Sequence, residues 1–264
     1  MSRLNLTRLR QMKAEHNKIA MLTAYDASFS HVLEQAGVDV ILVGDSLGMV
    51  IQGQESTLPV TVEDMIYHCR NVVRGSDKVF VIADMPFMSY ANEDQAIANA
   101  ARLMAEGGAQ MVKLEGGAVM ASTIEQLTAR GIPVCAHLGL LPQSVHRVGG
   151  YRVQGRDAET ADELIRDAIA LQEAGADMLV LECVPAVLGE KVTNALTIPV
   201  IGIGAGGICD GQVLVLYDML GLTPGKRPRF SYDFLADTGT IQSAISKYVT
   251  DVKSGQFPTL EQQY

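Results

Sequence analysis

The sequence predicts an α/β protein whose parallel strands close into a single (β/α)8, or TIM, barrel. Its 264 residues are close to the roughly 250 that one such barrel typically needs. Eight short apolar runs are rich in Val, Ile and Leu, as strands buried on both faces should be. Helical segments separate these runs, which is the order of elements in a parallel sheet. An open, doubly wound sheet would give the same order, so it is the main alternative.

The predicted strands are, in chain order, Ile19–Tyr25, Val38–Asp45, Val79–Asp84, Met111–Glu115, Ile132–His137, Met178–Glu182, Ile198–Gly204 and Val213–Tyr217. Amphipathic helices are predicted over Glu93–Glu106 and Ala158–Glu173, each with a glycine shortly after its end, which is a helix stop signal. The segments before Ile19 and after Ser231 are predicted to be extra terminal helices. Since no linker-like composition divides the chain, we expect one domain over residues 1–264.

Composition and charge limit the classes of partner. The chain is 48% hydrophobic and 19% charged, which is enough for a large core. Its net charge of −9, from 21 Lys+Arg and 30 Asp+Glu, argues against nucleic-acid binding, which needs a basic surface. Trp is absent and aromatic residues make up 5%, so platforms for base stacking are not expected. Small anionic substrates stay compatible, because a few local cations can override the global charge.

The cysteines and the hydropathy pattern predict a cytoplasmic protein that does not enter a membrane. The four cysteines form no CxxC pair and no Cys/His metal spacing, so buried, reduced thiols are expected. The first residues contain no apolar leader segment. No uncharged apolar segment reaches the ~18 residues of a membrane-spanning helix.

Five of the eight predicted strands are apolar until their last residues and then become polar. The polar residues at these strand ends are Asp45, Ser46, Asp84, Lys113, Glu115, His137 and Glu182. Lys113 and Glu115 are two residues apart, so both point to the same face of their strand. Isolated charges inside a barrel would be costly, but the carboxyl ends of the strands form the mouth where barrel active sites lie. The pattern therefore predicts an active site at this mouth.

Asp45, Asp84 and Glu115 offer three oxygen ligands and no sulfur or nitrogen, which suits magnesium or manganese rather than zinc. Each carboxylate alone could instead cap a helix or pair in a loop. Their occurrence on three strand ends favours the metal site. Lys113 is predicted to balance the acidic cluster and also to neutralise a substrate carboxylate or a developing enolate oxygen.

Glu182 and His137 are candidates for proton transfer. Glu182 follows four apolar residues, so it is expected in a partly dry setting and is a plausible general base or acid. His137 is either a hydrogen-bonded residue at a strand end or a part of the site. A divalent cation, a lysine and a nearby base together favour carbon–carbon bond formation at the enolate of a small α-keto acid.

Two glycine-rich segments have a functional and a structural interpretation. Residues 202–207 satisfy G-x-G-x-x-G, but they follow the seventh strand and a further apolar run begins at Val213, unlike a dinucleotide-binding unit. Glycines that let the barrel mouth approach a ligand are the better interpretation. Residues 149–155 form either a mobile flap over the site or an oligomer contact. Thr61 is a predicted helix N-cap, with Asp64 at the third helical position.

Many motifs occur together in order along nearly the whole chain. They are TAYD at 23–26, GDSLGM at 44–49, STLPVT at 56–61, ADMPF at 83–87, KLEGG at 113–117, HLGLLPQS at 137–144, GGYRVQG at 149–155, LECVP at 181–185 and IGIGAG at 201–206. In these motifs the chain closely resembles the ketopantoate hydroxymethyltransferase family. It departs from the family pattern at Leu141, where Thr is common, and at Arg152, where Lys is common. Neither residue is a predicted ligand.

The resemblance implies a barrel of the phosphoenolpyruvate/pyruvate type, Mg²⁺, and 5,10-methylenetetrahydrofolate as the one-carbon donor to 3-methyl-2-oxobutanoate. The implied metal ligands are Asp45, Asp84 and Glu115. The implied keto-acid-binding residues are Asp45, Ser46, Asp84, Lys113 and, with a less defined role, His137. Glu182 is the implied proton acceptor. The resemblance also implies a large homo-oligomeric ring, commonly a homodecamer.

Two other functions fit part of the pattern. An α-keto acid lyase or a phosphonopyruvate mutase of the same superfamily would share the metal chelate but would not use folate. A ring-forming metabolite-binding protein would bind the keto acid without turnover or proton exchange. A folate-dependent reaction of 3-methyl-2-oxobutanoate would distinguish the hydroxymethyltransferase from both.

Overall fold

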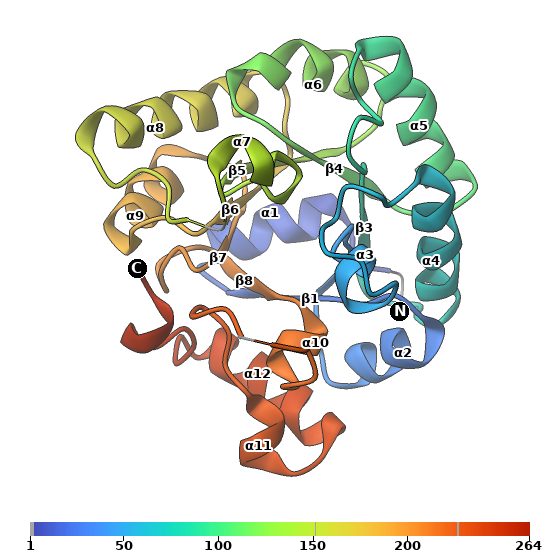
Figure 1. Ribbon diagram of the computed structural model, residues 1–264, viewed down its shortest axis with the longest axis vertical. Helices are drawn as coiled ribbons and strands as arrows, with labels where there is room; N and C mark the ends of the chain where they lie inside the picture. The colour runs from blue at the N-terminus through green and yellow to red at the C-terminus, as the bar shows by residue number, and fades with distance from the viewer. Residues whose placement is uncertain (1–2, 151, 226) are drawn as a thin grey trace.

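Eight parallel strands form a closed barrel in the order of the chain, each paired with its neighbours in sequence and β8 paired with β1 (Figure 1). The computed structural model describes residues 3–150, 152–225 and 227–264. The strands are β1 Ile19–Thr23, β2 Val40–Val43, β3 Phe80–Asp84, β4 Met111–Glu115, β5 Val134–Gly139, β6 Met178–Glu182, β7 Val200–Ile203 and β8 Gly211–Leu214. The predicted (β/α)8 barrel is confirmed, and the open-sheet alternative is wrong.

The helices surround the barrel, and α10, α11 and α12 lie toward the bottom of the view in Figure 1. They are α1 Leu6–Ala14, α2 Ala27–Gln35, α3 Leu47–Val50, α4 Val62–Arg74, α5 Glu93–Ala105, α6 Ala121–Thr128, α7 Val145–Val148, α8 Ala158–Glu173, α9 Ala186–Ala195, α10 Leu216–Met219, α11 Phe234–Thr238 and α12 Ile241–Lys253, with short 3-10 turns at Ala118–Met120, Pro142–Ser144 and Leu260–Gln262. The expected terminal helices are therefore present. None of the helices in the described parts of the chain is long and apolar enough to cross a membrane.

Most predicted elements lie where their patterns placed them, but two strands are shifted. β5 begins and ends two residues after the predicted Ile132–His137. β4, β6 and α8 have the predicted bounds. β8 begins two residues before the predicted strand and ends before Tyr217, which belongs to α10. Gly211 and Gln212 gave no apolar signal, although both are buried, and the Gln212 amide donates to the Gly206 carbonyl oxygen at 3.0 Å. Residues 204–210, between β7 and β8, contain no helix.

Local capping explains where α4, the second helix after β2, begins. The Thr61 hydroxyl accepts a hydrogen bond from the Asp64 backbone N–H at 3.1 Å. In return, the Asp64 carboxylate accepts one from the Thr61 backbone N–H at 3.0 Å. This reciprocal pair satisfies two N–H groups that a helix start leaves free, and it confirms the predicted N-cap of α4.

The register of the strands aligns the polar strand ends with one another. Asp84 on β3 is paired with Lys113 on β4. Glu115 on β4 is paired with His137 on β5. Because paired residues in a parallel sheet point to the same face, these four side chains extend into one region at the carboxyl ends of the strands.

The amino ends of the strands are closed by α1, which lies across the barrel in Figure 1. Leu9 and Met12 of α1 are buried. Arg10 pairs with Asp177, which directly precedes β6, and the Lys13 ammonium lies 2.7 Å from the carboxylate of Asp210, which directly precedes β8. These ion pairs hold α1 against the amino ends of the strands. The polar side chains at the carboxyl ends are not involved in this closure.

The seam between β1 and β8 is joined from outside by Tyr248 of α12. Its hydroxyl lies 2.9 Å from the carbonyl oxygens of both Met21 on β1 and Gln212 on β8. A hydroxyl has one proton, so the two oxygens share a single donor. The Tyr248 ring is buried edge-to-face against Phe234 and Phe257.

Replacing Tyr248 by Phe keeps the ring but leaves two buried carbonyl oxygens without this donor. We expect Tyr248→Phe to lower the free energy of unfolding by about 1–3 kcal/mol, measured by urea unfolding. The matched control is Tyr67→Phe, because the Tyr67 side chain is largely exposed. Equal effects of the two substitutions would contradict a role of the hydroxyl at the seam.

Candidate functional site

A cavity of about 850 Å³ opens at the carboxyl ends of the strands. This end of a (β/α)8 barrel is where active sites form, because eight loops converge there. Every predicted site residue lines the cavity: Asp45, Ser46, Asp84, Lys113, Glu115, His137 and Glu182. The structure therefore brings together side chains that are distributed over more than a hundred residues of sequence.

Lys113 and Asp84 form a buried ion pair on the floor of the cavity. The Lys113 ammonium lies 2.8 Å from Asp84 Oδ1, and both side chains are almost fully enclosed. The other carboxylate oxygen of Asp84 accepts a hydrogen bond from the backbone N–H of Asp45 at 3.0 Å. Asp84 thus joins the end of β4 to the residue that follows β2.

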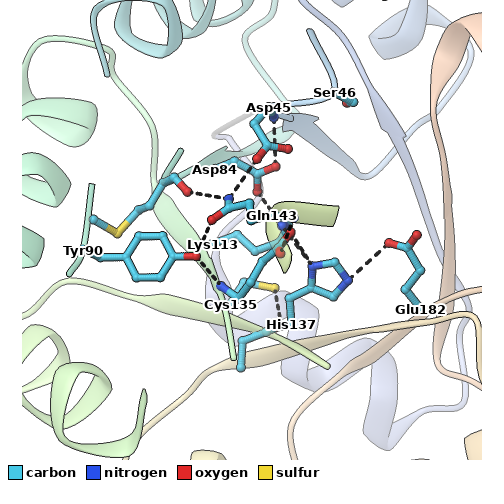
Figure 2. Close-up of polar contacts among 12 residues, drawn as sticks. Asp45, Ser46, Asp84, Tyr90, Lys113, Cys135, His137, Gln143 and Glu182 are labelled. Atoms are coloured by element: carbon cyan, nitrogen blue, oxygen red, sulfur yellow. Dashed lines mark hydrogen bonds and ion pairs between the residues drawn. The ribbon is translucent and has the colours of Figure 1, made fainter. Parts of the chain in front are cut away.

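His137 lies between two glutamates on the neighbouring strands, and Figure 2 shows it facing Glu182. Its Nδ1 is 3.3 Å from Glu115 Oε1, and its Nε2 is 3.3 Å from Glu182 Oε2. Nδ1 is also 3.3 Å from the Lys113 ammonium. The imidazole is therefore the link between Glu182 and the group around Lys113.

The loop after β5 contributes a residue for which the sequence gave no specific role. The Gln143 amide donates to Asp45 Oδ2 at 2.8 Å and to the Met85 carbonyl oxygen at 3.0 Å, while its backbone N–H donates to Glu115 Oε2 at 3.1 Å. Its side-chain oxygen accepts from the Tyr90 hydroxyl at 2.5 Å. Gln143 therefore holds two of the predicted metal ligands, and its position beside Asp45 can be followed in Figure 2. An amide in a loop is too common to indicate such a role from sequence.

The charges of the floor are strongly coupled. Burial raises the pKa of Asp45 well above its usual value, and the nearby carboxylates of Asp84 and Glu115 raise it further. Burial also opposes ionisation of Lys113 and Glu115. Nevertheless, the three carboxylates raise the pKa of Lys113 above its usual value, and contacts with His137 and Lys113 lower that of Glu115. The floor thus holds more negative charge than Lys113 alone neutralises.

His137 supplies part of the missing positive charge. Burial and the neighbouring Lys113 lower the pKa of its imidazole. The hydrogen bonds with Glu115 and Glu182 outweigh both effects, and the net result is a pKa of about 9. A protonated imidazole between two carboxylates is consistent with the distances on both sides.

The three predicted metal ligands fit a hard divalent cation in their chemistry. Their donors are all carboxylate oxygens, and Asp84 Oδ1 has no well-aligned hydrogen bond within the described residues despite its contact with Lys113. In the same part of the chain, no three His, Cys, Asp or Glu side chains form a ready ligand cluster. Mg²⁺ commonly takes one or two carboxylates and completes its shell with water and substrate oxygens, so partial ligation by Asp45, Asp84 and Glu115 suits it.

Two residues shape the rim beside the charged floor. The Ser46 hydroxyl lies 2.9 Å from the hydroxyl of Tyr25, which fixes its direction at the edge of the group in Figure 2. Cys183, directly after Glu182, has a φ of 50°, which is unusual for a residue with a side chain. The strained backbone turns the chain sharply after the carboxylate. The four cysteines are buried and have free thiols, as expected.

The glycine-rich segments have structural reasons of their own. Gly204 has a φ of 64°, and a Cβ there would come within 3.0 Å of Phe230 and Tyr264. In residues 149–155, the Gln154 N–H donates to the Cys183 carbonyl oxygen at 2.9 Å, and Arg152 lines the cavity. Tyr151 lies outside the described residues. The predicted flap therefore borders the site, whereas its mobility and any oligomer contact stay predictions.

Comparisons with known proteins show the family of this chain. A family described as ketopantoate hydroxymethyltransferase matches residues 3–260. The 3-methyl-2-oxobutanoate hydroxymethyltransferase of Nitrosococcus oceani is 68% identical, with 100% of both chains covered. That of Colwellia psychrerythraea is 58% identical over 98% of this chain and 97% of its own. Phosphonopyruvate hydrolase, solved as a complex with oxalate and Mg²⁺, shares the fold with a TM-score of 0.65 at 14% identity, covering 97% of this chain and 96% of that one.

A family match over almost the whole chain, together with full-length relatives of this identity, confirms the resemblance drawn from the motifs. The chain belongs to the ketopantoate hydroxymethyltransferase family of transferase enzymes.

Proposed function

We propose that this protein transfers a hydroxymethyl group from 5,10-methylenetetrahydrofolate to 3-methyl-2-oxobutanoate, forming 2-dehydropantoate (ketopantoate) for pantothenate and coenzyme A biosynthesis. The name carried by full-length relatives supports the reaction. The observation that carries the proposal is the arrangement of the cavity: a cation-binding floor made by Lys113 and carboxylates, with a separate carboxylate, Glu182, linked to it through His137.

The floor suits the anionic end of the keto acid. The Lys113 ammonium is buried and held by Asp84, so it can pair with a substrate carboxylate or with the oxygen that becomes the enolate. Ser46 is at the rim of the same floor and offers a hydroxyl that Tyr25 orients. We assign Asp45, Ser46, Asp84, Lys113 and His137 to keto-acid binding.

Mg²⁺, when held by Asp45, Asp84 and Glu115, supplies positive charge that offsets the crowded carboxylates and acidifies the C3 proton of the keto acid. Gln143 keeps the carboxylates of Asp45 and Glu115 in position through its amide and its backbone N–H. The donors are thus fixed before substrate binds, which reduces the entropic cost of assembling the site.

Glu182 is assigned as the base that removes the C3 proton. Its side chain is 12% exposed, and its Oε2 lies 3.3 Å from His137 Nε2 without a well-aligned hydrogen bond, so it is placed beside the imidazole and still reaches the cavity. The enolate carbon then forms a bond to the methylene carbon of the folate, and water supplies the hydroxyl oxygen. The methylene carbon's two carbon–nitrogen bonds, to N5 and N10, break, and the protons taken from C3 and from water end on these two nitrogens. A homodecamer and a cytoplasmic location accompany this assignment as predictions.

The decisive assay is release of tetrahydrofolate from 5,10-methylenetetrahydrofolate in the presence of 3-methyl-2-oxobutanoate, with Mg²⁺ and after its removal by a chelator. We expect release that needs both the keto acid and the cation, because the carboxylate floor lacks enough positive charge without it. Keto-acid cleavage without any need for folate would favour a lyase or mutase instead. Keto-acid binding without proton exchange or turnover would favour the metabolite-binding alternative.

Asp84→Asn keeps the shape of the side chain but removes its charge. We expect exchange of the C3 proton of the keto acid into heavy water, followed by NMR, to fall by at least about a hundredfold. The matched control is Asp177→Asn at the opposite end of the barrel, where a carboxylate also binds a backbone N–H and an arginine. Undiminished exchange in Asp84→Asn would refute the proposed role of the floor.

Glu182→Gln keeps the size of the side chain and its place beside His137 but removes the base. We expect turnover and C3 exchange to fall by about 10²- to 10⁴-fold, which is the usual contribution of a general base. Keto-acid affinity, measured by calorimetry, should change far less. Glu190→Gln serves as control, because Glu190 is exposed on α9. If affinity fell in proportion to turnover, Glu182 would be a binding group and another residue would be the base.

A further inference from the structure

The cavity extends beyond the charged floor to a second wall that the keto acid does not need. This wall comes from the end of β8, from α10 and from the segment before α11, which follow one another around the mouth beside β1 (Figure 1). Its lining residues are Val213, Val215, Asp218, Thr223, Pro224 and Phe230. Apart from Asp218 and Thr223 these six residues are apolar, and a flat organic ring system would fit against them. Arg227 and Arg229 of the same segment also line the cavity.

Asp218 is a buried carboxylate that lines the cavity and is only 7% exposed. The Thr223 hydroxyl donates to its Oδ1 at 2.5 Å. Within the described residues, no other side chain donates a hydrogen bond to this carboxylate and no cation pairs with it. The positive charge of Arg227 lowers the pKa of Asp218, but the Arg227 guanidinium pairs with the Asp233 carboxylate at 3.3 Å. The second oxygen of Asp218 is therefore available to a ligand.

Three other carboxylates of the mouth have a basic partner, because Asp84 faces Lys113 while Glu115 and Glu182 face His137. Asp45 accepts from the Gln143 amide, but it belongs to the predicted metal site. Burial raises the pKa of Asp218 above its usual value, and the hydrogen bond from Thr223 offsets only part of that cost. A buried carboxylate with an unused oxygen gains most from a ligand that donates hydrogen bonds.

We propose that Asp218 binds the aminopyrimidinone edge of the pterin ring of the one-carbon donor, through the ring N3–H and the 2-amino group. These two donors lie side by side in one plane and match the acceptors of a carboxylate. The inference rests on the proposed folate-dependent function and assigns a residue to its second substrate. The pterin would lie against Val213, Val215 and Pro224.

The outer rim of the cavity supports this orientation of the folate. Arg152, Arg156 and Arg229 line the cavity and are exposed. A folate has donors at its pterin end and carboxylates at its glutamate end, so arginines favour the glutamate outside and an internal carboxylate favours the pterin inside. The reverse orientation would place anionic carboxylates next to Asp218.

The test uses Asp218→Asn, which retains an oxygen for the Thr223 hydroxyl but replaces the second acceptor with a donor. Tetrahydrofolate and its 2-desamino analogue are titrated against the full-length wild-type and variant proteins. We expect the wild type to prefer tetrahydrofolate by on the order of ten- to a hundredfold, as a charged hydrogen bond implies. The variant should lose this preference and bind tetrahydrofolate correspondingly more weakly.

Two controls separate recognition from a structural role. Thr223→Val removes the internal hydrogen bond of Asp218, and it should preserve the preference over the 2-desamino analogue even if overall affinity falls. Exchange of the C3 proton of the keto acid without folate should stay unchanged in Asp218→Asn. Loss of exchange would show that the substitution disturbs the keto-acid half and would overturn the assignment.

The outcomes also separate this inference from the proposed function. If the wild type turns over with folate but Asp218→Asn retains the preference for tetrahydrofolate, only the assignment of Asp218 is wrong. If the wild type neither binds tetrahydrofolate nor releases it from the methylene form, the proposed function fails and this inference fails with it.

Discussion

The mouth of the barrel depends on one buried cation, the ammonium of Lys113. It lies 2.8 Å from Asp84 and close enough to Asp45 and Glu115 for all three carboxylates to raise its pKa. Without it, Asp84 would be a buried carboxylate with no cation beside it, and unpaired buried charges are too costly to retain. The rest of the mouth is arranged around this balance: Gln143 ties Asp45 to Glu115, and Tyr90 fixes Gln143.

The barrel makes this concentration of charge tolerable because its two ends have different tasks. At the amino ends of the strands, α1 supplies arginine and lysine partners to single aspartates. Behind the seam of β1 and β8, α12 closes the sheet with an aromatic cluster and the Tyr248 hydroxyl. Stability is thus provided away from the mouth. The carboxyl ends can then hold more negative charge than is optimal for folding, as functional sites commonly do.

The sequence sufficed for the barrel and for the residues of the floor, and the physical reasons are specific. Apolar runs that end in a charge are rare unless the charge lies at a mouth, so Asp84, Lys113 and Glu115 could be predicted from position alone. β8 was misplaced because glycine and glutamine carry no apolar signal even when they are buried. Gln143 and Asp218 were missed because their roles depend on contacts between distant loops, and neither an amide nor an aspartate is unusual in a loop. The closeness of Glu182 to His137 likewise required the register of β5 and β6.

The fold shifts the pKa values of neighbouring carboxylates in opposite directions, which suits them to different roles. Asp45 and Glu115 lie on one floor, yet burial and repulsion raise the pKa of the first while His137 and Lys113 lower that of the second. Glu182 is separated from both by the imidazole, which is itself protonated well above its usual range. A positive imidazole between Glu182 and the floor reduces the repulsion between Glu182 and the floor carboxylates. Under the proposed function, the position of His137 allows the floor to hold a cation while Glu182 acts as the base.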